Sequence, residues 1–96
     1  MEPVHLSDEQ RGRLLSLAAN RKIRRVRVFG SAVHEDSGPP NDLDLLVDMA
    51  PGASLLDLIA FKLDAEELLG YRVDVVSSGG LSPYLKDQIL AEAVAL

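Results

Sequence analysis

The 96-residue sequence contains no cysteine and no tryptophan, and it has only two tyrosines and two phenylalanines. The absence of cysteine excludes disulfide frameworks, thiolate zinc sites and cysteine nucleophiles. With two histidines and no cysteine, no convincing zinc site or Ser-His-Asp arrangement can be assembled either. Because aromatic residues are so few, the core of a single domain spanning residues 1–96 must consist mainly of leucine, valine, isoleucine and alanine.

Basic residues and long apolar runs are also scarce. Ten lysines and arginines are outnumbered by fifteen aspartates and glutamates, which gives a net charge of −5. A chain of this charge is not expected to bind nucleic acid by general attraction to phosphates. No apolar run approaches the roughly 20 residues that cross a bilayer, and the first residues show no signal-peptide pattern. We therefore expect a cytoplasmic protein that does not contact a membrane.

Capping residues and hydrophobic spacing predict three helices and three strands. The predicted helices cover about residues 8–20, 55–69 and 84–94, and the predicted strands cover residues 23–29, 42–48 and 72–76. A short helix or loop is expected after the first strand, with a loop over residues 35–41, and a second loop is expected at residues 77–80. No repeat or low-complexity linker divides the chain.

Aspartates at alternating positions mark the second and third predicted strands. A strand sends alternate side chains to opposite faces, so Asp42 and Asp44 share one face while Leu43 points to the other. Asp74 lies between two valines and repeats this arrangement. If the two strands pair, three carboxylates converge, and a cation relieves their repulsion. Mg²⁺ is the natural occupant, because it prefers oxygen ligands and is held by one or two carboxylates together with substrate phosphates.

The Gly30-Ser31 pair ends the first predicted strand, with ten residues between Ser31 and Asp42. A glycine lets backbone N–H groups approach phosphate oxygens, and a helical turn opening at Ser31 favours an anion. Asp48 shares a face with Asp42 by alternation, but it lies at the end of its strand. We expect Asp48 to be a solvated carboxylate rather than a ligand.

Gly30-Ser31, Asp42-Leu43-Asp44 and the later Asp74 together resemble the nucleotidyltransferase superfamily typified by polymerase β. The short length and the ending Ile89-Leu90-Ala91-Glu92-Ala93-Val94 are similar to its minimal bacterial branch, the MNT-type antitoxins that are paired with HEPN-domain ribonuclease toxins. The resemblance covers nearly the whole chain. It implies an α/β fold in one minimal nucleotidyltransferase domain, with a small mixed β-sheet and helices packed mainly on one side.

The same resemblance implies an activity and roles for individual residues. Asp42, Asp44 and Asp74 would be the catalytic residues and would bind Mg²⁺, two ions in all, with Asp74 nearest the attacking hydroxyl. Gly30 and Ser31 would hold the phosphates of ATP. The implied reaction transfers AMP from ATP to a tyrosine hydroxyl of a cognate HEPN toxin, so that the protein acts as an antitoxin.

One departure from the family pattern concerns positive charge. Relatives often carry Arg-Ala-Arg-Gly after the Gly-Ser pair, whereas this chain has Ala32-Val33-His34-Glu35, so two phosphate-seeking charges are missing. Five of the ten basic residues instead lie within positions 21–27. This cluster is either a solvated turn and strand face or a docking patch for a partner or for nucleotide phosphates.

Two other functions are compatible with the sequence. The protein could neutralise its partner by occlusion without catalysis, or it could be a small metal-dependent nuclease, because carboxylates around two cations also hydrolyse phosphodiesters. Leu56, Ile59 and Leu63 fall outside the main apolar stripe of their predicted helix. We therefore expect a helical partner or a homo-oligomer to cover them.

Overall fold

A four-stranded mixed sheet forms the centre of the protein in a computed structural model that describes residues 6–30 and 42–96. The elements in chain order are α1 (Asp8–Asn20), β1 (Ile23–Phe29), β2 (Asp42–Met49), α2 (Leu55–Leu69), β3 (Arg72–Ser77), the 3₁₀ helix η3 (Ser78–Gly80), α3 (Pro83–Glu92) and β4 (Val94–Ala95). The strand order is β3-β2-β1-β4. β2 runs antiparallel to β1 and parallel to β3, and β4 runs antiparallel to β1.

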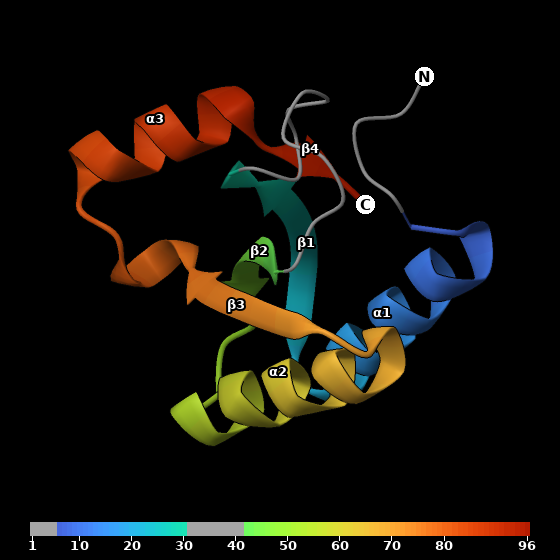
Figure 1. The fold of residues 1–96 in the computed structure, drawn as a ribbon. Coiled ribbons are helices and arrows are strands. Elements are labelled where there is room, and N and C mark those ends of the chain that lie inside the picture. Colours follow the sequence, from blue (N-terminus) through green and yellow to red (C-terminus); the bar gives the residue numbers. More distant parts are fainter. Residues whose placement is uncertain (1–5, 31–41) are drawn as a thin grey trace.

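Two helices cover one face of this sheet. Figure 1 shows α1 and α2 side by side below the strands, with α3 on the opposite side. The buried core lies between the sheet and the α1/α2 pair, and the described residues that form it are all apolar. The largest of its fully buried side chains include Phe61, Leu14, Leu43, Leu45 and Val28. The predicted α/β fold, with a small mixed sheet and helices mainly on one side, is confirmed.

Local capping explains where the helices begin and end. The Ser7 hydroxyl accepts a hydrogen bond from the Gln10 backbone N–H at 3.0 Å, and the Gln10 side chain accepts one from the Ser7 N–H, which completes a capping box. Gly70 ends α2 with φ +79°, a left-handed conformation that glycine adopts without steric cost. The predicted bounds of α1 and α2 agree with these caps.

The end of the chain differs from the sequence prediction. The predicted last helix continues to about Val94, but α3 ends at Glu92, and Ala93 is extended with φ −69° and ψ 143°. Val94 then pairs with Val28, and the Leu96 N–H donates to the Val26 carbonyl at 3.1 Å. This added strand covers part of the outer edge of β1. Among the described residues, no helix is long and apolar enough to cross a membrane.

Candidate active site

The face of the sheet that points away from α1 and α2 carries two of the predicted site residues. Asp44 lies directly opposite Asp74 in the parallel β2–β3 pair and opposite Phe29 in the antiparallel β1–β2 pair. Leu43 and Val73 form the next register pair, and both are buried on the core side. The alternation that buries these two therefore brings the two aspartates together on the other face, which we call the acidic face.

Gly30 lies against Asp44. Its φ of +73° is in the left-handed region, and a Cβ built at this position would overlap Asp44 Oδ2 and lie 3.3 Å from Asp44 Cγ. Glycine is thus required at position 30 for two independent reasons: its backbone is in a left-handed conformation, and a side chain there would overlap Asp44. The structure brings Gly30 and Asp44 into contact at the end of β1, although 13 residues separate them in the sequence.

Asp74 has a basic neighbour on its own strand. Arg72 Nε donates to Asp74 Oδ1 at 3.3 Å, and the two side chains are 69% and 36% exposed. Val73, the residue between Arg72 and Asp74, connects β3 to α2, because its backbone N–H donates to Glu66 Oε2 at 3.0 Å. This bond and the ion pair with Lys62 hold the pKa of Glu66 below its ordinary value. The edge strand that carries Asp74 is thereby fixed to the helical layer.

Two other predicted site residues remain predictions. Ser31 lies outside the described residues, and so does the side chain of Asp42, although the backbone of Asp42 begins β2 and is the register partner of Arg72. In the part of the chain that the structure describes, no three histidine, aspartate or glutamate side chains are grouped as metal ligands. The convergence of three carboxylates is therefore not tested.

Asp48 is not the solvated carboxylate that its position predicts. Its Oδ1 accepts a hydrogen bond from the Ser78 hydroxyl at 2.6 Å, and its Oδ2 pairs with Arg27 Nη1 at 3.2 Å. The Ser78 hydroxyl first, and the Arg27 and Arg25 guanidiniums in addition, hold the pKa of Asp48 below its ordinary value. Asp48 therefore fastens η3 and β1 to the far end of β2.

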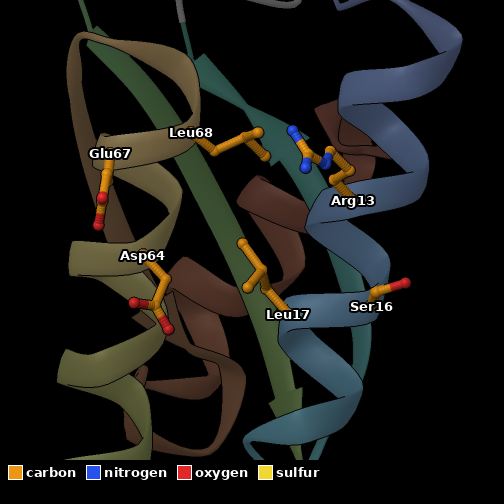
Figure 2. A pocket seen from close by; sticks show the side chains of 6 residues that line it. All are labelled: Arg13, Ser16, Leu17, Asp64, Glu67 and Leu68. Atoms are coloured by element: carbon orange, nitrogen blue, oxygen red, sulfur yellow. The ribbon is translucent and has the colours of Figure 1, made fainter.

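A groove of about 690 Å³ lies elsewhere, between α1 and α2. Figure 2 shows Leu17 and Leu68 extending into it from opposite helices, with Arg13 on α1 and with Asp64 and Glu67 on α2. Because α1 and α2 cover the core side of the sheet, this groove is separate from the acidic face. None of the predicted site residues lines it.

Comparison with known proteins identifies the family. The family model described as polymerase beta nucleotidyltransferase matches residues 14–96. The chain belongs to this family. Over 87 residues it is 37% identical to a Methanocaldococcus jannaschii protein named as a candidate protein adenylyltransferase, covering 91% of this chain and 94% of that protein. A nucleotidyltransferase was predicted, and family membership confirms it.

Two solved structures extend the comparison. The structure of a candidate minimal nucleotidyltransferase matches with a TM-score of 0.80 and 44% identity, and the match covers 100% of this chain and 97% of that one. A chain in the complex of a tri-AMPylated Shewanella oneidensis HEPN toxin with an MNT antitoxin matches with a TM-score of 0.70 and 17% identity, covering 94% of this chain and 71% of that one. At that identity, the second match shows a shared fold only.

Sequence reasoning overlooked one residue of this nucleotidyltransferase. Arg72 stands two positions before Asp74 on the same strand, so the alternation that places Asp74 on the acidic face places Arg72 there too. The signal was present in the sequence as Arg72-Val73-Asp74.

Proposed function

We propose that this protein transfers AMP from ATP, with Mg²⁺, to a tyrosine hydroxyl of a HEPN-type partner toxin and so acts as its antitoxin. Family membership supports nucleotidyl transfer, and the name of the M. jannaschii relative supports a protein acceptor. The structural match to a chain from a complex that contains an AMPylated HEPN toxin supports the choice of partner. The observation that carries the proposal is the register of Asp44 with Asp74 beside Gly30.

The residues present fit a magnesium ion. Asp44 and Asp74 supply hard carboxylate oxygens from adjacent strands, and Asp42 begins the same strand as Asp44. The space that Gly30 leaves by lacking a Cβ is occupied by the Asp44 carboxylate. When bound, Mg²⁺ would neutralise charge on the phosphates and on the attacking hydroxyl.

The chain itself contributes mainly position and charge. Gly30 follows β1 with a left-handed φ of +73°. Because it lacks a Cβ, backbone N–H groups beside it could come close to phosphate oxygens, and the Ser31 hydroxyl would add a donor. Asp74 would orient the acceptor hydroxyl and take its proton. The hydroxyl oxygen then forms a bond to the α-phosphorus, the bond to the bridging oxygen breaks, and pyrophosphate leaves.

Incubation with α-labelled ATP, Mg²⁺ and the toxin encoded beside this protein tests the proposal. The wild type should transfer label to the toxin. Asp44→Asn should reduce transfer by at least about a hundredfold, since it removes a carboxylate that would hold the Mg²⁺ that stabilises charge in the transition state. Asp87→Asn, which makes the same change on the exposed surface of α3, is the matched control. Lack of transfer to a toxin that the wild type binds would refute the proposal.

The alternative function, occlusion without catalysis, has a structural observation in its favour. On α2 the exposed side chains Leu56, Ile59 and Leu63 form a stripe opposite the buried Phe61 and Ala65. We propose that the partner toxin covers this stripe. Glu67 and Asp64 flank it, and each copy of the chain has a net charge of −5, so a partner with basic residues fits better than a second copy.

The two functions differ in their dependence on the aspartates. Neutralisation by occlusion should survive the double substitution of Asp42→Asn and Asp44→Asn, because neither residue lies on α2. Neutralisation by AMP transfer should be lost in that variant, while binding of the toxin persists. Growth of cells that express the toxin together with each variant gives the readout.

A further inference from the structure

We propose that Arg72 binds the triphosphate of the incoming nucleotide and supplies the side-chain positive charge that the segment after Gly30 lacks. This inference rests on the proposed function, because it assigns a residue to the same nucleotide site. Arg72 begins β3, whereas Gly30 follows the end of β1. The evidence is its place in the sheet, its contacts and the distribution of the other cations.

The need for such a residue comes from the sequence. Residues 31–41 read SAVHEDSGPPN and contain no lysine or arginine, but they contain two acidic residues. Whatever their conformation, these residues offer no permanent cation to a triphosphate. Asp42 and Asp44 follow these residues in the sequence, and Asp74 is the register partner of Asp44. Because the site is built from carboxylates, an anionic nucleotide would require positive charge from a side chain in addition to Mg²⁺.

The structure places Arg72 where this charge is required. Arg72 is the register partner of Asp42, and it stands two residues before Asp74, the register partner of Asp44. Its Nε contacts Asp74 Oδ1 at 3.3 Å. Within the described residues, the Nη groups of Arg72 make no hydrogen bond, so the outer edge of the guanidinium is available for a second anion.

The pair with Asp74 does not hold Arg72 permanently. The Arg72 side chain is 69% exposed, and ion pairs between exposed side chains are weak. A guanidinium matches phosphate oxygens in a bidentate arrangement, which a single Nε contact to a carboxylate does not provide. An arriving triphosphate can therefore recruit Arg72 at little cost.

The other arginines of the acidic face are placed differently. Arg27 lies opposite Leu46, and its Nη1 pairs with Asp48 at 3.2 Å, at the end of β2 away from Asp44. Arg25 lies opposite Asp48 and is farther still from Asp44. Among the described residues of this face, Arg72 is thus the arginine beside the Asp44–Asp74 pair.

Equilibrium binding of ATP and of adenosine, each with Mg²⁺, tests the assignment by calorimetry. Arg72→Gln should weaken ATP binding by about tenfold or more, as expected for the loss of a charge-assisted hydrogen bond, and should leave adenosine binding within about twofold. Arg72→Lys should give an intermediate loss, because it keeps the charge without the bidentate fork. Arg13→Gln on α1 is the matched control and should bind ATP like the wild type.

A second measurement separates a phosphate contact from an effect transmitted through Asp74. Mn²⁺ binding without nucleotide should be unchanged or stronger in Arg72→Gln, since Arg72 competes with a cation for the Asp74 carboxylate. Loss of Mn²⁺ binding in parallel with ATP binding would overturn the proposal, because Arg72 would then act only by positioning Asp74. The proposal would also be overturned if Arg72→Gln weakened the binding of ATP and of adenosine equally, or if it left ATP binding unchanged.

These outcomes are distinct from failure of the proposed function. A wild-type protein that binds ATP but transfers no AMP would refute AMP transfer, and the Arg72→Gln comparison would still decide the role of Arg72. A wild type that binds no ATP would refute both. Melting temperatures of the variants should match the wild type, because Arg72 is exposed and lies at the beginning of an edge strand.

Discussion

Substitution of Gly30 by alanine should damage the site far more than the fold. Alanine at the observed φ of +73° costs about 1–2 kcal/mol of folding free energy. The new methyl group also overlaps Asp44 Oδ2, and the carboxylate must rotate away from it. A side chain forced off its rotamer costs roughly another 1 kcal/mol. The total loss of unfolding free energy is therefore expected to be about 2–3 kcal/mol.

Gly70→Ala provides the matched control. Gly70 has a similar φ of +79°, but among the described residues no atom beyond its chain neighbours lies within 4 Å of the position that a Cβ would occupy. Urea unfolding should therefore show only the backbone cost of about 1–2 kcal/mol in Gly70→Ala. In the Asp44→Ala background the cost of Gly30→Ala should fall to that same value, because the overlapping carboxylate is gone.

Mn²⁺ binding and AMP transfer give the functional readout of Gly30→Ala. Because the substitution displaces the Asp44 carboxylate, both should be lost under conditions in which the variant is fully folded, whereas Gly70→Ala should retain both. The reasoning is refuted if Gly30→Ala costs no more stability than Gly70→Ala and binds Mn²⁺ with unchanged affinity.

Three further substitutions address the remaining parts of the molecule. Asp48→Asn should lower the unfolding free energy by about 1 kcal/mol at about pH 6. Because folding lowers the pKa of Asp48 from 3.8, the stabilisation that Asp48 provides should disappear as the pH falls below that value. Urea unfolding at a series of pH values would show this loss. Phe61→Ala, at a fully buried position, should cost about 3–5 kcal/mol in the same assay. Replacing Leu56 and Leu63 together by serine should change the unfolding free energy by less than about 1 kcal/mol, but should abolish co-purification with the toxin; retained binding would exclude the α2 stripe as the interface.

The elements that were predicted correctly have local causes. Ser7 and Gly70 set helix ends through contacts within three or four residues, and the alternation of β2 and β3 follows from side chains on consecutive positions. These signals are contained in short stretches of sequence. The placement of Asp44 and Asp74 on the same face also follows from alternation once the two strands are known to be neighbours, whereas their direct pairing depends on the register of β2 and β3.

The features that were missed depend on contacts between distant residues. β4 consists of two residues that pair with β1 more than 60 positions earlier, and the local sequence there favours helix over strand. Ser78 reaches Asp48 across 30 positions. A strand of two residues has no periodicity, and a single serine in a glycine-rich loop has no distinctive pattern, so neither could be identified from sequence alone.

Asp44 and Asp48 show why alternation alone does not identify a functional carboxylate. Both lie on the acidic face of β2, separated by the buried Leu46, and the sequence pattern treats them alike. Their neighbours in space make them different. Asp48 has a hydroxyl and a guanidinium that satisfy its charge and fasten η3 to the sheet. Asp44 is opposite another carboxylate and beside a glycine that makes room for it, and a cation would relieve the repulsion between the two carboxylates.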